Sequence, residues 1–347
     1  MMESKKRVVI IGGGFTGAYC AKRLRNNFDV TLIDNKEYFE FTPSVLKSII
    51  NPQNLKSIQI YHKDYLKNEK FVLGSVSEIK NNYVVVGKKK LEFDYLIIAS
   101  GSKYNSPIKD PKVFVPQRGK EISEFSERIK EARSILIVGG GLVGVELSAE
   151  IATRCEKKEI MLIDAGKEIL SRNNEKTRKF ARNFLESKGT NIISDEKVIS
   201  NKGNVFFTDK KRKIKADLVF MCTGIKSNSG FMIKNFKNKL NEKGQIRTNG
   251  FLQLDGCENI FVGGDVTDIA EEKTAQNSEG HARIIVENIK RIEKNGRLRE
   301  YKTKPGVFVI SLGKNNGIFE YGNFSFSGIA PFIMKKIIEI KTMWRYR

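Results

Sequence analysis

Short runs of β-branched residues alternate with amphipathic stretches along most of the chain. The run Val8–Ile11 leads into a glycine-rich turn and an amphipathic stretch, and a second apolar run follows at Val30–Ile33. The same series returns with the runs Ile135–Val138 and Glu159–Ile163. Strand, helix and strand in this order build a parallel sheet. The pattern therefore predicts an α/β fold that contains two Rossmann-like units.

The pattern predicts further strands and one long helix between and after the two units. Strands are expected at Phe71–Val76, Tyr83–Val86, Phe93–Ile98, Val205–Thr208, Ile214–Phe220 and Ile260–Gly263. A helix is expected at Thr274–Arg291, and the charged segments Asp209–Lys213 and Lys234–Lys243 are expected to be loops. The break at Pro305-Gly306 separates this body from a tail of different character.

Composition and charge limit the class of protein. The 347 residues exceed the roughly 250–300 at which a single core stops growing, so at least two domains are expected. A net charge of +22 would attract nucleic acid, anionic lipid or phosphorylated ligands, although a lysine-rich solvated surface accounts for it equally well.

The four cysteines show no CxxC spacing and there are two histidines, so no metal site is expected. With no secretory signal and no uncharged stretch longer than 14 residues, we expect a cytoplasmic protein that is soluble or lies on the inner face of a membrane.

A GxGxxG motif follows the first strand of each unit. Its glycines are Gly12, Gly14 and Gly17 in the first unit and Gly139, Gly141 and Gly144 in the second. The first glycine permits a tight turn, the second lets the backbone approach a pyrophosphate, and the third allows helix and strand to pack closely. An acid ends the second strand of each unit, Asp34 and Asp164, and can accept hydrogen bonds from a ribose. Each unit is thus predicted to bind a dinucleotide.

Three later segments resemble the turns that close the two halves of a known flavoprotein superfamily. They are Phe93–Ser102, Ala216–Gly224 and Asn259–Asp265. With the glycine motifs they are similar to the pyridine-nucleotide–disulfide oxidoreductases, which implies the two-dinucleotide-binding flavoprotein fold with a short C-terminal extension. The resemblance implies that 1–112 and 246–300 form an FAD-binding domain, 113–245 an NAD(P)H-binding domain and 301–347 a C-terminal region. The dithiol of the superfamily is missing, because Cys20 is the only cysteine in the first half of the FAD domain.

The resemblance also implies roles for individual residues. Besides the six glycines and two acids, the expected cofactor-binding residues are Phe15, Thr16, Lys36, Thr42, Pro43, Val76, Ala99, Ser100, Gly101, Leu142, Val143, Thr223, Gly224, Gly264, Asp265, Thr274 and Ala275. Asp164 favours NADH as donor, while Lys167 and Arg172 leave NADPH open. His62 is expected at the surface or an interface.

Further segments resemble the type II NADH dehydrogenases and, more closely, the ferroptosis-suppressor (apoptosis-inducing-factor-like 2) proteins. They are Asp34–Pro43, Tyr61–Tyr65, Glu272–Ala282, Tyr301–Gly306 and Ser311–Gly317. The resemblance implies non-pumping electron transfer from NAD(P)H through FAD to a membrane quinone. The residues implied in catalysis are Glu146, Gln276, His281 and Lys341. Glu146 could relay protons or simply stabilise its helix dipole. The quinone-side helix matches in part, since Gly280 replaces a second glutamine.

The tail and the charge leave alternatives open. Apolar and basic residues at helical spacing in 328–347 predict an amphipathic helix on anionic lipid, with Lys341 and Trp344 at a quinone entry. The same pattern fits a helix docked on the protein's own core or on a partner in a homodimer. Two other functions are compatible with the sequence. One is a soluble reductase of a small ferredoxin- or rubredoxin-type protein, and the other is a redox-controlled binder of nucleic acid or a partner. Binding of nucleic acid is the weaker hypothesis, because the basic residues are spread along the chain.

Overall fold

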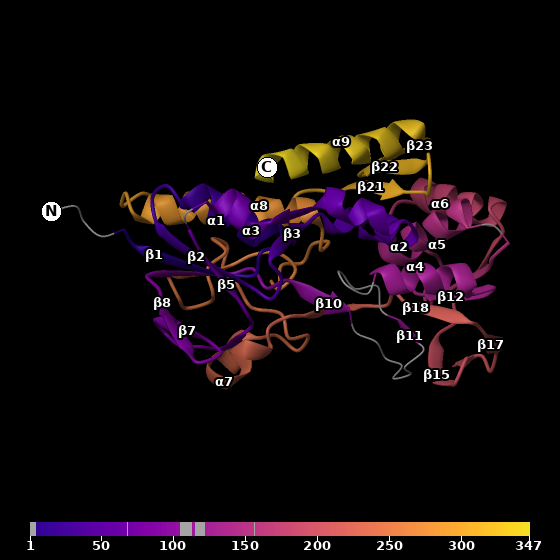
Figure 1. Cartoon of the computed structure of the whole chain (residues 1–347), viewed down its shortest axis with the longest axis horizontal. Helices are drawn as coiled ribbons and strands as arrows, with labels where there is room; N and C mark the ends of the chain where they lie inside the picture. Colours follow the sequence, from indigo (N-terminus) through magenta and orange to yellow (C-terminus); the bar gives the residue numbers. More distant parts are fainter. Residues whose placement is uncertain (1–4, 68, 105–112, 115–121, 156) are drawn as a thin grey trace.

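Two parallel five-stranded sheets form the framework of the molecule (Figure 1). The computed structural model describes residues 5–67, 69–104, 113–114, 122–155 and 157–347. The first sheet has the order β20 (Ile260–Val262), β9 (Tyr95–Ile98), β1 (Arg7–Ile11), β2 (Asp29–Asp34) and β5 (Lys70–Leu73). The second has the order β11 (Val113–Phe114), β18 (Leu218–Met221), β12 (Ser134–Val138), β13 (Glu159–Ile163) and β14 (Thr190–Ile193).

Helices cover both sheets because the central strands are apolar on both faces. β1, β9 and β12 are almost entirely buried, as is typical of strands within a parallel sheet. The helices of the first unit are α1 (Phe15–Leu24), which packs on α8 (Ala275–Ile292), and the short α2 (Val45–Ile50) and α3 (His62–Leu66). The second unit has α4 (Ile122–Glu131), α5 (Leu142–Arg154) and α6 (Glu175–Ser187). The predicted α/β fold with two Rossmann-like units is confirmed.

Each unit carries a small antiparallel sheet beside its parallel one. These are β6 (Val76–Ile79), β7 (Tyr83–Val86) and β8 (Lys89–Glu92) in the first unit and β15 (Val198–Lys202), β16 (Val205–Thr208) and β17 (Lys213–Lys215) in the second. The strands β10 (Ser102–Tyr104) and β19 (Ile225–Ser227) pair antiparallel and join the units. A further pair, β3 (Tyr38–Glu40) and β4 (Gln59–Tyr61), flanks the 3-10 turns at Thr42–Ser44 and Pro52–Ile58.

The chain returns to the first unit earlier than the predicted boundary at residue 245. A 3-10 turn at Gly230–Met232 leads into α7 (Ile233–Phe236), where the sequence predicted a loop, and a second 3-10 turn follows at Lys237–Lys239. Met232 and Phe236 are buried in one cluster with Val9 and Ile11 of the first sheet. Because these apolar side chains complete the core under β1, Met232 and Phe236 pack with the first unit.

The C-terminal region lies over both units. β21 (Val307–Ser311), β22 (Gly317–Tyr321) and β23 (Phe324–Gly328) form an antiparallel sheet beside the second unit, and α9 (Ile329–Tyr346) runs from there towards α1 and α3 (Figure 1). The predicted tail helix is confirmed, and it buries Pro331, Met343 and Tyr346 against the body. In the described part of the chain, no helix has the length and apolar character needed to cross a bilayer.

Candidate functional site

The first glycine turn needs glycine for two different reasons. A Cβ on Gly12, whose φ is +98°, would lie 2.3 Å from the carbonyl oxygen of Ala99, and one on Gly17 would lie 1.8 Å from that of Gly12. At both positions, backbone atoms occupy the space that a side chain would need. A Cβ on Gly14 would meet nothing within 4 Å. Gly12 and Gly17 therefore shape the turn, whereas Gly14 borders open space.

That open space lies at an uncapped helix end. Gly14 is the N-cap of α1, no side chain caps the helix, and its first turn holds no acid. The free N–H groups and the positive end of the helix dipole suit a phosphate. Phe15 and Thr16 follow, but Thr16 Oγ1 donates to the carbonyl oxygen of Ser278 at 2.9 Å, so its side chain fastens α1 to α8.

Asp34 lies beside this turn at the end of β2. Its Oδ2 accepts from the backbone N–H of Gly13 at 2.6 Å, and its Oδ1 accepts from that of Lys36 at 3.1 Å. Burial opposes ionisation of Asp34, but the adjacent His62 and the charge of Lys36 outweigh it and hold the pKa of the carboxyl below its ordinary value. His62 Nε2 lies 3.6 Å from Asp34 Oδ2. His62 is fully buried, so the prediction of a surface position was wrong.

The carboxyl ends of β9 and β20 meet at the same edge of the first sheet. Gly101 and Gly264 have φ values of +66° and +81°, and Ser102 Oγ donates to Asp265 Oδ2 at 2.8 Å, which links the two turns. Ser100 Oγ is buried without a hydrogen-bond partner in the part of the chain that the structure describes. An orphaned hydroxyl next to open space and an uncapped helix end fits a polar cofactor. Val76, which begins β6, is half-buried and packs against the core.

The second unit repeats this geometry. A Cβ on Gly139 would lie 2.8 Å from the carbonyl oxygen of Cys222, one on Gly144 would lie 1.8 Å from that of Gly139, and one on Gly141 would meet nothing within 4 Å. Gly141 is the uncapped N-cap of α5, whose first residues Leu142 and Val143 are half-buried. The turn after β18 holds Thr223 and Gly224, the latter at φ +60°. This unit too can hold a dinucleotide.

Asp164 occupies the place of Asp34 in the second unit. Its Oδ2 accepts from the N–H of Gly140 at 2.5 Å and its Oδ1 from that of Gly166 at 2.7 Å. Lys167 is exposed, and Arg172 pairs with Glu272 at 3.1 Å. The arginine is thus engaged by an acid of the other unit.

The start of α8 was predicted to face the flavin. The Oγ1 of Thr274 caps the helix by accepting from the N–H of Asn277 at 3.2 Å, Ala275 is half-buried, and Gln276 is exposed. The buried His281 accepts from the N–H of Gly264 at Nδ1, 2.9 Å away, and its Nε2 lies 2.9 Å from Glu271 Oε1. Since Nδ1 accepts, the proton is on Nε2 and faces the acid. His281 therefore holds the Gly264-Asp265 turn in place.

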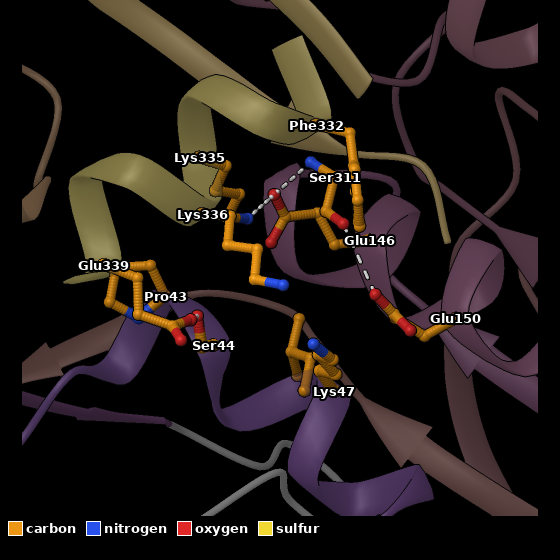
Figure 2. Close-up of a pocket in the computed structure, with 11 residues that line it drawn as sticks. Pro43, Ser44, Lys47, Glu146, Glu150, Ser311, Phe332, Lys335, Lys336 and Glu339 are labelled. Carbon is orange, nitrogen blue, oxygen red and sulfur yellow. Dashed lines mark hydrogen bonds and ion pairs between the residues drawn. The ribbon is translucent and has the colours of Figure 1, made fainter. Parts of the chain in front are cut away.

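Glu146 lies at the junction of α5, β21 and α9 (Figure 2). Its Oε1 accepts from the N–H of Ser311 at 2.8 Å and from Lys335 Nζ at 2.6 Å. The sequence analysis missed Lys335 and instead placed Lys341 of the same helix among the catalytic residues. Lys341 is exposed and is not among the residues that line this pocket.

Glu146 lines a pocket that extends to the 3-10 turn before α2. Its lining includes Pro43, Ser44, Glu146, Phe332, Lys335 and Glu339. Ser44 Oγ donates to Glu339 of α9, directly after Thr42-Pro43 (Figure 2). The inner face of α9 thereby contacts the loop predicted to lie at the flavin and the helix predicted to lie at the nicotinamide.

The outer face of α9 is apolar. Its residues Ile329, Ile333, Ile337, Ile340 and Trp344 are exposed at intervals of three or four, and we call them the outer stripe. Trp344 is 79% exposed, so it does not line the pocket. An exposed apolar row of this length in a monomer indicates an interaction surface.

Comparisons with known proteins agree with this geometry. A family model described as pyridine nucleotide-disulphide oxidoreductase matches residues 6–282. Apoptosis-inducing factor homolog A of Dictyostelium discoideum is 34% identical, over 95% of this chain and 89% of that protein. Ferroptosis suppressor protein 1 of Homo sapiens is 32% identical, over 97% of this chain and 95% of that protein.

Solved structures match over nearly the whole chain. NDH2 from Plasmodium falciparum in complex with NADH has a TM-score of 0.86 at 17% identity, covering 99% of this chain and 96% of that one. The sulfide:quinone oxidoreductase of Aquifex aeolicus has a TM-score of 0.88 at 17% identity, covering 99% and 91%. At these identities the two structures show that the fold is shared.

Proposed function

Because the chain belongs to the pyridine nucleotide-disulphide oxidoreductase family, we propose that it carries electrons from NADH to a quinone at a membrane surface. The family makes it an oxidoreductase that uses FAD and NAD(P)H. What we propose beyond the family is that the acceptor is a quinone, that NADH is the preferred donor and that the reaction takes place at a membrane surface. Two relatives in fold support it, since one was solved with NADH and the other is named for quinone reduction.

Each of the two dinucleotide sites is proposed to bind a different cofactor. Gly14, Asp34, Ser100 and Asp265 are proposed to hold FAD, which when bound supplies the hydride and electron chemistry. Gly141 and Asp164 are proposed to hold the pyrophosphate and ribose of the nicotinamide nucleotide. These residues would bind and orient the cofactors.

The position of α9 carries the proposal of a lipid-borne acceptor. Its outer stripe is apolar and exposed, while Lys335 and Glu339 on its inner face reach Glu146 and Ser44. A quinone dissolved in lipid would need to travel only past this helix to reach the loop at Pro43. Each turnover would oxidise NADH to NAD⁺ and reduce the quinone to hydroquinone, which takes up one proton from solution besides the hydride.

The cysteines favour a quinone over a disulfide as acceptor. Burial raises the pKa of the Cys20 thiol and raises that of Cys222 to about 12. All four cysteines are free in the described part of the chain, and Cys20 Sγ points at the carbonyl oxygen of Ala282 in the core. Buried, protonated thiols are poor partners for thiol exchange.

The acceptor can be tested directly. The full chain loaded with FAD should oxidise NADH faster with a quinone in anionic liposomes than with oxygen or with a small ferredoxin. Equal or higher rates with ferredoxin would favour the soluble reductase, and a protein that takes up no FAD would remove the proposal.

The nucleotide preference has its own test. Asp164→Ala should narrow the preference for NADH over NADPH by roughly 1–3 kcal/mol, because a hydrogen bond to a charged group is lost. The ratio of kcat/KM values for the two donors measures it. Asp255→Ala, at a mostly exposed side chain, is the matched control. Equal use of both donors by the unmodified protein would contradict the preference.

A further inference from the structure

We propose that the last turn of α9 is part of the FAD site, because Tyr346 acts through Tyr65 and His62 to position Asp34. The inference rests on the proposed assignment of Asp34 to FAD. It makes Tyr346, Tyr65 and His62 positioning residues behind the glycine turn.

Tyr346 lies in an aromatic cluster of the first unit. It is fully buried, and its ring centroid lies 4.6 Å from that of Phe39 and 5.2 Å from that of Tyr65. Phe39 in turn contacts Phe15, the first residue of α1 after Gly14, edge to face at 5.2 Å. The end of α9 thus packs directly behind the glycine turn.

Polar contacts fix this end of α9 in place. Lys22 of α1 donates to the carbonyl oxygen of Arg345, and the Arg345 guanidinium pairs with Glu279 of α8 at 2.7 Å. Met343 is buried, whereas Trp344 points outwards. Only the inner face of this turn therefore packs on the first unit.

The ring of Tyr346 packs on Tyr65, and from Tyr65 a buried polar series leads to Asp34. The Tyr65 hydroxyl lies 2.6 Å from His62 Nδ1, and His62 Nε2 lies 3.6 Å from Asp34 Oδ2. Burial is the main cause of the raised pKa of Tyr65, so the phenol stays neutral and can donate to Nδ1. The Nε2 proton of His62 then points at the carboxylate. Among the described residues, Nε2 makes no hydrogen bond, and the acid that it is paired with is Asp34.

His62 also supports the glycine turn itself. A Cβ on Gly13 would lie 2.3 Å from His62 Cε1 and 2.6 Å from Asp34 Oδ2, so ring, carboxylate and backbone are in close contact. If Tyr346 is removed, the cavity lets Tyr65 and His62 move, and Asp34 loses its support. At the matching turn of the second unit, a Cβ on Gly140 would meet Ile169 and Asp164 instead of a histidine.

FAD titration of the apo-protein, followed by quenching of flavin fluorescence, tests the inference. Tyr346→Ala and Tyr65→Phe should each raise the Kd for FAD about fivefold to tenfold, the effect of one hydrogen bond or less. Tyr346→Phe keeps the ring and should leave the Kd unchanged. Trp344→Ala, on the same turn but exposed, is the control.

Two further measurements separate positioning from general stability. A positioning role predicts that Tyr65→Phe reduces the rise in Tm that FAD causes, while the KM for NADH stays the same. If Asp34→Ala weakens FAD binding but Tyr346→Ala and Tyr65→Phe do not, the inference is overturned. If Asp34→Ala leaves the Kd unchanged, the assignment of Asp34 fails instead. Should Tyr346→Ala not fold, Tyr65→Phe and His62→Gln decide by the same readouts.

Discussion

The glycines of the two turns have distinct roles that only the structure separates. Gly12 and Gly17 are closed by backbone oxygen atoms, whereas Gly14 and Gly141 face open space with φ values of −77° and −74°. Any residue can adopt those φ values. Substitution at Gly14 or Gly141 therefore acts on the cofactor and not on the chain.

Gly14→Ala and Gly141→Ala should form a reciprocal pair. Gly14→Ala should raise the Kd for FAD at least about tenfold, because its methyl group enters the space for the pyrophosphate, and should change the Tm of the apo-protein little. Gly141→Ala should do the same to NADH binding and leave FAD binding intact. Titration of each nucleotide into both variants checks this. Gly17→Ala, which clashes with backbone, should lower the Tm, and a similar loss in Gly14→Ala would contradict the distinction.

The glycines and acids could be predicted from sequence because the motif is local. Asp34 ends its strand and Gly12 precedes its helix within one βαβ unit. His62 could not be predicted at Asp34, since nothing near Tyr61-His62 in the sequence specifies the fold of β3 and β4 that brings it there. The buried roles of His62 and His281 depend on contacts between distant segments.

At the scale of elements, periodic segments were predicted well and docking faces were not. β13 and β16 occupy the predicted residues, and α8 begins and ends within one residue of its prediction. The predicted strand Phe71–Val76 is instead divided, because Leu73 ends its pairing with β2 and Val76 begins pairing with β7. For α9 the helix was predicted, but the lysine that meets Glu146 depends on how the helix sits on the body.

Lys335 and Lys341 lie on the same helix, but only Lys335 contacts Glu146, whereas Lys341 is exposed. The two lysines therefore form a matched pair for substitution. Lys335→Met should lower kcat/KM for quinone reduction by a factor equivalent to about 1–3 kcal/mol, since Glu146 loses a charged hydrogen-bond partner in a largely buried place. Lys341→Met removes the same charge from an exposed position and should have little effect. Steady-state rates at saturating FAD compare them. Equal losses in the two variants would contradict a special role for Lys335.

The outer stripe of α9 can be altered without touching its inner face. Ile337→Glu combined with Ile340→Glu should abolish sedimentation with anionic liposomes, because apolar burial is lost and like charges are added. Reduction of FAD by NADH should persist, since both positions are exposed. Sedimentation assays check this, with Ile233→Glu, an exposed position on α7, as control. Truncation of α9 is a poorer test because it also removes the buried Tyr346.

At the scale of the whole molecule, the two dinucleotide units share one core. The largest apolar cluster contains Val8 and Leu32 of the first sheet together with Ile137 and Leu162 of the second. α2, which belongs to the first unit, packs on α4 and α5 of the second unit, and α9 contacts β4 of the first unit and, through Lys335, Glu146 of α5. Units joined in this way do not lose their cores independently.

Thermal unfolding should therefore be one cooperative transition, although the chain is longer than most two-state proteins. FAD, bound to the first unit, should raise the Tm of the whole molecule, because the second unit cannot unfold without exposing the shared cluster. Ile49→Ala, a buried substitution in α2, should cost about 2–5 kcal/mol and weaken the connection, so that a second, earlier transition becomes visible by calorimetry. Two separate transitions in the unmodified protein, with only one of them shifted by FAD, would show that the units unfold independently despite their common core.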